Sequence, residues 1–173
     1  RGVDNGNKLD LCERKGAAER LGVNRADGAK TEIIPSRILG SNEVAPLTMA
    51  AADATVAANG LFCKPIAITK VLDPSRKELP IPTADCRQVV APNITSAVEY
   101  AMSKVLSEGT AKKSALAGGR VAGGKTGTTQ NNISLWFTGY TPQPSTAAVT
   151  STPAGAYYNH RRRSERRRVG EEG

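Results

Sequence analysis

Apolar residues recur across residues 93–106 with the spacing of one helix face, and this stripe stops at Gly109. The pattern predicts an amphipathic helix. A second helix is expected over residues 46–58, because a proline opens the segment, no helix breaker interrupts it and an Asn-Gly pair follows it. A third, shorter helix is expected over residues 11–21, between an acidic start and a glycine stop.

A small hairpin is expected between the second and the last of these helices. Residues 65–72 are rich in isoleucine and valine and predict a strand, which an Asp-Pro-Ser turn connects to a short return at residues 79–81. After the last helix, residues 109–119 contain several glycines and basic residues, and we expect a flexible loop there.

Three further strands are expected at residues 120–129, 134–141 and 145–151, joined by short polar turns of which Asn131-Asn132 is the first. Helices followed by a strand meander are typical of an α+β domain with an antiparallel sheet covered by helices. Trp136 lies in the second of these strands, and a lone tryptophan there is expected to anchor the core.

The 173 residues are enough for one domain with a single core. We expect residues 1–153 to form a partial domain and residues 154–173 to be a disordered arginine-rich tail. Aromatic residues make up only 4% of the chain, so each buried position contributes little area and an isolated core would be weakly stabilised. The start at Arg1, with no signal-like apolar stretch, suggests an interior cut, and no apolar run reaches the roughly 20 residues that cross a bilayer.

Without a run of six arginines in the tail, the chain would be only slightly basic, so its formal net charge of +8 depends on that run. Its arginines are Arg161, Arg162, Arg163, Arg166, Arg167 and Arg168. Such a run is more often solvated than bound to a polyanion, so nucleic-acid binding is disfavoured. Two origins of the tail stay open: a reading frame that was truncated or shifted, and a genuine basic appendage that binds anionic polymer.

The three cysteines are Cys12, Cys63 and Cys86. Their spacing includes no Cys-x-x-Cys pair, and the single histidine lies far away in the tail, so a metal site is not expected. Cys63 and Cys86 flank the predicted hairpin, which would bring them together. A disulfide formed in an oxidising compartment and a pair of buried thiols are the two alternatives.

The segment with the clearest chemistry runs from Lys125 through Thr126 and Gly127 to Thr128, behind two glycines. A lysine and hydroxyl groups beside flexible backbone can bind a carboxylate, help to move a proton and bring an amide N–H to a reacting carbonyl. These groups suit acyl transfer. The plainer alternative is a solvated strand lysine between ordinary β-forming threonines. No serine is followed three positions later by a lysine, so the nucleophile and base that such chemistry needs are expected on a missing part of the protein.

Three blocks of the sequence resemble the penicillin-binding transpeptidases, and especially their bifunctional class A. The blocks are residues 39–50 (LGSNEVAPLTMA), 121–129 (VAGGKTGTT) and 135–142 (LWFTGYTP). Together they extend the resemblance over most of residues 8–152. It implies an incomplete penicillin-binding/β-lactamase-like transpeptidase fold whose active-site edge strand contains Lys125.

The resemblance also implies a role for each residue of that strand. Lys125 would shape the potential of the pocket and assist proton movement, while the hydroxyls of Thr126 and Thr128 would hold the carboxylate of a peptidoglycan stem peptide or a β-lactam. Gly127 would let the strand approach the ligand, and the Thr128 backbone N–H would form half of an oxyanion hole. The chemistry that the resemblance implies is that of a serine acyl-enzyme without metal or cofactor.

The leading hypothesis is therefore a C-terminal piece of a peptidoglycan D,D-transpeptidase. Because the Ser-x-x-Lys and Ser-x-Asn motifs of that family would lie before Arg1, this piece alone is expected to be inactive. Its parent would act on the extracytoplasmic face of a bacterial membrane, held there by an upstream anchor. Two alternatives remain: a non-catalytic module that keeps the carboxylate-binding edge, and a piece that does not fold stably.

Overall fold

The computed structural model describes residues 11–25, 27, 29, 43–129 and 134–151. These residues form helices packed on a small antiparallel sheet, so the predicted α+β class is confirmed. The α-helices are α1 (Leu11–Arg20), α2 (Pro46–Ala57) and α3 (Pro92–Ser107), close to the predicted bounds. The predicted turn at Asn131-Asn132 and the tail at residues 154–173, with its six arginines, lie outside the described residues.

The bounds of α2 and α3 follow from proline and glycine placement. Both helices begin with a proline, at Pro46 and Pro92, whose missing N–H costs a first turn nothing. Asn59 and Gly60 follow the end of α2 and adopt φ angles of 54° and 89°. A Cβ at Gly60 would lie 2.0 Å from the Val90 carbonyl oxygen. Only glycine therefore fits at position 60 of this left-handed turn.

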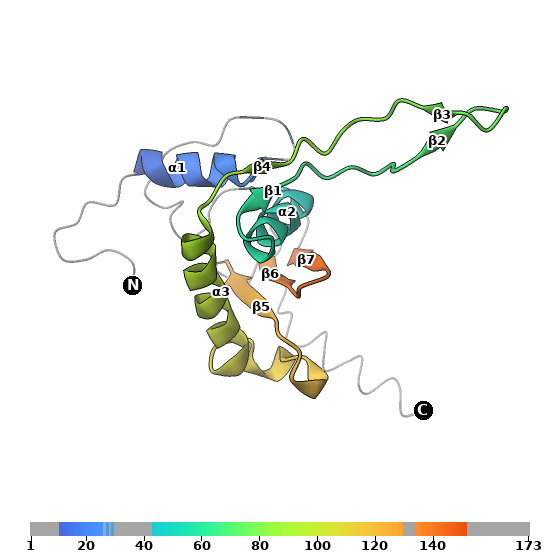
Figure 1. Ribbon diagram of the computed structural model, residues 1–173. Coiled ribbons are helices and arrows are strands. Elements are labelled where there is room, and N and C mark those ends of the chain that lie inside the picture. Colours follow the sequence, from blue (N-terminus) through green and yellow to red (C-terminus); the bar gives the residue numbers. More distant parts are fainter. Residues whose placement is uncertain (1–10, 26, 28, 30–42, 130–133, 152–173) are drawn as a thin grey trace.

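The main sheet follows the strand order β5-β6-β7 and is antiparallel throughout. Its strands are β5 (Gly123–Thr128), β6 (Ser134–Tyr140) and β7 (Ser145–Ser151). As Figure 1 shows, α3 runs beside β5, while α2 packs against β6 and β7. The central strand β6 thus contacts α2 and both neighbouring strands.

The core of the described residues is small. Its buried apolar side chains are Ala52, Val56, Phe62, Leu106, Ala111 and Tyr140. Trp136, expected to anchor the core, is only half-buried, and its indole N–H donates to the Ser134 hydroxyl at 2.9 Å. That expectation was wrong, because Trp136 is paired with Gly127, which has no side chain to cover the indole ring.

Two polar atoms enclosed in this core have no hydrogen-bonding partner. Asp53 of α2 is only 6% exposed and contacts Thr138 of β6, yet its Oδ2 atom has no partner. Burial raises the pKa of Asp53 to about 6, and the hydrogen bond with Thr138 opposes this shift. The Tyr140 hydroxyl is also unpartnered, and burial, with the charges of Glu99 and Asp53, raises its pKa to about 12. The core therefore contains a carboxyl group that is poorly accommodated when charged.

The predicted hairpin exists, but its strands are shorter than the expected ranges 65–72 and 79–81. Only β2 (Val71–Leu72) and β3 (Glu78–Leu79) pair, at the tip of an arm that projects from the body (Figure 1). The turn is held by the Asp73 carboxylate, which accepts a hydrogen bond from Ser75 at 2.7 Å and from the Lys77 backbone at 2.9 Å. Most large apolar residues of the arm remain exposed, namely Ile66, Ile68, Leu72 and Leu79, so burial does not extend the strands.

The base of the arm is closed by a strand pair that the sequence did not predict. β1 (Leu61–Phe62) pairs with β4 (Arg87–Gln88), far along the chain. Two-residue strands carry no period that a sequence pattern can reveal. The Phe62 ring is packed tightly here: a Cβ at Gly22 would lie 2.5 Å from it, and the Arg87 guanidinium lies 5.3 Å from the ring centroid.

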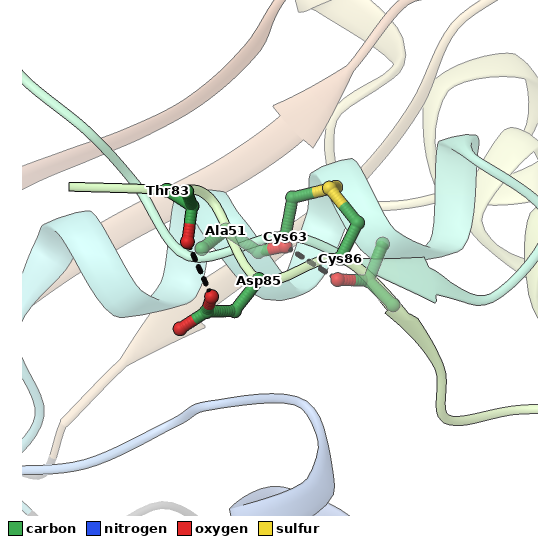
Figure 2. The surroundings of a disulfide bond; sticks show 6 residues. Ala51, Cys63, Thr83, Asp85 and Cys86 are labelled. Carbon is green, nitrogen blue, oxygen red and sulfur yellow. Dashed lines mark hydrogen bonds between the residues drawn. A yellow bond between two sulfur atoms is a disulfide. The ribbon is translucent and has the colours of Figure 1, made fainter. Parts of the chain in front are cut away.

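Immediately beyond this pair, Cys63 and Cys86 form a disulfide with a Cα–Cα distance of 4.1 Å (Figure 2). The Lys64 backbone N–H donates to the Ala84 carbonyl at 2.7 Å, and the Lys64 ammonium donates to the Asp85 carboxylate at 2.6 Å. Lys64 and then Thr83, both hydrogen-bonded to Asp85, lower the pKa of its carboxyl group. Covalent and polar contacts together fix the point where the arm leaves the body.

Replacing both Cys63 and Cys86 with alanine is expected to lower the free energy of unfolding by about 2 kcal/mol, because the unfolded chain gains the entropy of an open loop. Urea denaturation followed by circular dichroism measures this change. Dithiothreitol should destabilise the original chain by a similar amount and leave the double variant unchanged. If the reductant lowers the stability of both proteins equally, the stabilisation does not come from this disulfide.

Candidate functional site

The residues that the sequence assigned to substrate binding and catalysis all lie on β5. This strand pairs with β6 on one side and with no other strand of the described residues, so it forms an edge of the sheet. Lys125 and Thr128 are exposed, whereas Thr126 and Gly127 are half-buried. The structure therefore presents the Lys-Thr-Gly segment at an accessible sheet edge.

The hydrogen-bonding phase of the sheet decides which backbone groups point outward from that edge. The Thr129 N–H donates to the Ser134 carbonyl at 3.0 Å, and the Thr141 N–H donates to the Pro144 carbonyl at 2.9 Å. Hydrogen-bonded and non-hydrogen-bonded pairs alternate along an antiparallel ladder. Counting residue by residue from either contact therefore assigns the same residues of β6 to hydrogen-bonded pairs with β5. Thr128, paired with Leu135, is then a non-hydrogen-bonded position, and its N–H points away from β6.

The side chains of the segment divide between the two faces of the sheet. Since successive strand residues alternate, Thr126 and Thr128 share one face and Lys125 belongs to the other. The Lys125 ammonium nevertheless reaches the outer edge, where it donates to the Thr126 carbonyl at 2.5 Å. That carbonyl occupies a non-hydrogen-bonded position opposite Phe137, so it too faces outward. An ammonium, a hydroxyl and an amide N–H thus lie along one short stretch of edge.

The two glycines before Lys125 have a packing role rather than the flexibility expected from sequence. Gly123 and Gly124 are both buried. A Cβ at Gly123 would lie 2.6 Å from the Tyr140 ring, and one at Gly124 would lie 2.7 Å from the Phe137 ring. Glycine at these positions lets two aromatic rings of β6 lie directly against β5. The strand is consequently held close to its neighbour where it enters the site.

A residue that the sequence did not single out contacts the segment directly. The Thr110 hydroxyl lies 2.6 Å from the Thr126 hydroxyl, and either one can be the donor. Thr110 follows α3 in the part predicted as a flexible loop. That prediction was wrong, because residues 109–119 contain two short 3-10 helices, Lys112–Ser114 and Ala117–Gly119. No pattern in the sequence connects Thr110 to a position 16 residues away.

An apolar cavity lies beside the beginning of β5 but does not include the segment. Its volume is about 130 Å³, and its lining includes Leu106, Leu116, Gly123, Phe137, Tyr140 and Pro144. None of the residues from Lys125 to Thr128 lines this cavity. The chemistry that the segment can perform therefore belongs to its exposed edge, which has donors and a positive charge suited to an anionic ligand.

Neither a metal centre nor a membrane span is found in the part of the chain that the structure describes. There, no three side chains of histidine, cysteine, aspartate or glutamate are grouped as ligands of one ion. The described helices are all too short or too polar to cross a bilayer. The Cys63–Cys86 pair lies at the base of the arm, on the continuation of the β1–β4 pair and not on the β5 edge.

Comparisons with known proteins place this fold and segment in a family. The family model described as "Penicillin binding protein transpeptidase domain" matches residues 20–165. Penicillin-binding protein 1A of Aquifex aeolicus is 35% identical over 107 residues, which cover 62% of this chain and 15% of that protein. Penicillin-binding protein 1A of Clostridium acetobutylicum is 32% identical over 143 residues, which cover 81% of this chain and 17% of that protein.

A solved structure gives the same result for the fold. The PonA1 protein of Mycobacterium tuberculosis in complex with penicillin V superposes with a TM-score of 0.70 and 26% sequence identity, covering 84% of this chain and 42% of that one. This chain thus spans less than half of the solved structure, and the two curated relatives align over only 15% and 17% of their length. The structural superposition and the family model both cover most of this chain. The chain belongs to the family of penicillin-binding protein transpeptidase domains.

Proposed function

We propose that this chain is the part of a peptidoglycan D,D-transpeptidase that contributes the Lys-Thr-Gly edge of the acylation pocket. The observation that supports this function best is the outward direction of the Thr128 N–H on an accessible edge strand. Such a donor can stabilise the negative charge that develops on a carbonyl oxygen during acyl transfer. Membership of the transpeptidase family makes this chemistry the natural use of the edge.

In the proposed reaction, a serine oxygen attacks the carbonyl carbon of the substrate while its proton passes to a base. The carbonyl oxygen becomes an oxyanion, which the Thr128 N–H stabilises. The ester of the acyl-enzyme forms as the amine leaves with a proton. Lys125 assists by its positive charge, and the Thr126 and Thr128 hydroxyls hold the terminal carboxylate of a stem peptide or the carboxylate of a β-lactam.

In this proposal, the nucleophilic serine belongs to a part of the protein outside these 173 residues. These residues contain neither Ser-x-x-Lys nor Ser-x-Asn. The relatives named above are penicillin-binding proteins, and PonA1 has been solved with penicillin V. We place the parent protein on the extracytoplasmic face of a bacterial membrane, held by an upstream anchor. The Cys63–Cys86 disulfide supports this location, because disulfides persist in oxidising compartments.

A fluorescent penicillin tests the proposal. The chain as printed should show no covalent label, whereas a chain extended upstream to include a Ser-x-x-Lys motif should be labelled on its serine. Replacing that serine with alanine should abolish the label. Gel fluorescence after denaturation detects the adduct. Covalent labelling of the unextended chain would show that it has its own nucleophile and would contradict the proposal.

A second candidate function is a non-catalytic module that binds carboxylates or β-lactams through the same edge. It is favoured by one observation: the edge is assembled in residues 123–128 although the printed sequence lacks the serine motifs. The two candidates differ in the extended chain. The module would bind penicillin reversibly and release it on denaturation, whereas the enzyme would retain it as an ester.

A further inference from the structure

We propose that Thr110 is a positioning residue that makes Thr126 a hydrogen-bond donor toward a bound carboxylate. This inference rests on the proposed function, since it concerns how the same edge distinguishes an anionic ligand from a neutral one. Thr110 would not touch the ligand. It would act through Thr126, whose hydroxyl lies 2.6 Å from its own.

The position of Thr110 is fixed by the way in which α3 ends. A Cβ at Gly109 would lie 2.8 Å from the Val105 Cα, so the chain can fold this closely against the last turn only with glycine. The Ala111 N–H then donates to the Val105 carbonyl at 3.1 Å, and the Ala111 side chain is buried. Thr110 lies between these two constrained residues and next to β5, against which α3 packs. The backbone on both sides of Thr110 is therefore fixed at the end of α3, and its exposed side chain meets Thr126 from there.

The direction of the hydrogen bond follows from the ligand that Thr126 would bind. A hydroxyl has one hydrogen to donate, and an ionised carboxylate can only accept. If Thr126 donates to Thr110, its hydrogen is already used and its oxygen would face the anion. If Thr110 donates to Thr126, the Thr126 hydrogen is available for the carboxylate. The second arrangement also strengthens the outer bond, because a hydroxyl that accepts one hydrogen bond becomes a better donor.

The contact between the Thr110 and Thr126 hydroxyls thus favours a negatively charged ligand over a neutral one. With a carboxylate at the edge, the chain of donors from Thr110 through Thr126 to the ligand is complete. A carboxamide also offers a carbonyl oxygen as acceptor, but a hydrogen bond to this neutral group is weaker than one to a carboxylate. The expected signature is a larger loss of affinity for the acid than for the carboxamide when the Thr110 hydroxyl is removed.

The experiment uses the full chain and two ligands, N-acetyl-D-alanyl-D-alanine and its C-terminal carboxamide, titrated by NMR. Thr110→Val keeps the shape of the side chain without its hydroxyl, and Thr110→Ser keeps the hydroxyl. We expect Thr110→Val to weaken binding of the acid about threefold, because the Thr126 hydroxyl loses the neutral hydrogen bond that orients and polarises it, and to weaken binding of the carboxamide less. Thr110→Ser should keep the affinity of the original chain for the acid.

The outcomes separate this inference from the function on which it rests. If the original chain prefers the acid and Thr110→Val weakens both ligands equally, Thr110 has only a structural role and the inference is wrong. The inference also fails if Thr110→Ser behaves like Thr110→Val, because the hydroxyl is then not responsible. If the original chain shows no preference for the acid, the proposed carboxylate-binding function itself is overturned.

Discussion

Replacing Thr128 with proline is expected to slow acylation by a β-lactam about 100- to 1,000-fold, the usual effect of removing one oxyanion-hole donor. The measurement uses a chain extended upstream to carry the Ser-x-x-Lys motif, with stopped-flow detection of a fluorescent penicillin. Proline removes the N–H of Thr128. Because that N–H points away from β6, the substitution removes no hydrogen bond of the sheet, and proline is tolerated on an edge strand in this orientation.

The matched control is Thr128→Val, which keeps the backbone N–H and removes only the hydroxyl. It should slow acylation by about tenfold or less, since only one side-chain hydrogen bond is lost. Near-equal circular dichroism spectra and melting temperatures would show that both variants fold. Should the proline variant react as fast as the valine variant, the Thr128 N–H does not stabilise the oxyanion.

Replacing Asp53 with asparagine is expected to stabilise the protein at about pH 8 by roughly 3 kcal/mol and to change little below about pH 4. The Asp53 carboxyl is buried, one of its oxygens has no partner, and its pKa is raised from 3.8 to about 6. Between these values the folded protein binds more protons than the unfolded chain. The free energy of unfolding of the original chain therefore falls as the pH rises through this window and is level above it.

Urea denaturation at a series of pH values, with the two proteins compared at each pH, measures this effect. The comparison cancels the contributions of Asp73 and Asp85. Hydrogen bonds lower the pKa values of these two carboxyl groups, so each of them stabilises the fold more as the pH rises. Near Asp53, the hydroxyls of Thr138 and Tyr140 do not titrate in this pH window. The charge of Glu99, on α3, contributes to the raised pKa of Tyr140. A difference between the two proteins that stays constant from about pH 4 to pH 8 would mean that Asp53 does not titrate with a raised pKa.

The elements that the sequence predicted well are those whose signal is local. The bounds of α2 and α3 follow from prolines, glycines and a 3.6-residue period, and the strands of the main sheet from the short polar turns between them. The arm was overextended because β-branched residues such as Ile66 and Ile68 predict strand whether or not anything covers them, and here they stay exposed. The β1–β4 pair had no signal of its own.

The candidate site was predictable only in part, because some of its features depend on contacts between residues that are distant in the sequence. A tripeptide with its flanking blocks was sufficient to select residues 125–128. The orientation of the Thr128 N–H depends on the register with β6, and the contact of Thr126 with Thr110 depends on how α3 packs against β5. Neither is a property of local sequence. The unpartnered carboxyl of Asp53 was likewise hidden, since a single aspartate in a predicted helix gives no sign of its burial.

Because hydrogen-bonded and non-hydrogen-bonded positions alternate along β5 and β6, the site keeps its geometry only if the length of β5 changes by an even number of residues. Deleting one residue between Gly123 and Thr128 would exchange inward and outward backbone groups beyond the deletion and turn each following side chain to the opposite face. Only changes of two residues would preserve both. Natural variants of this strand should therefore differ by substitution and not by single insertions or deletions, whatever residues occupy it.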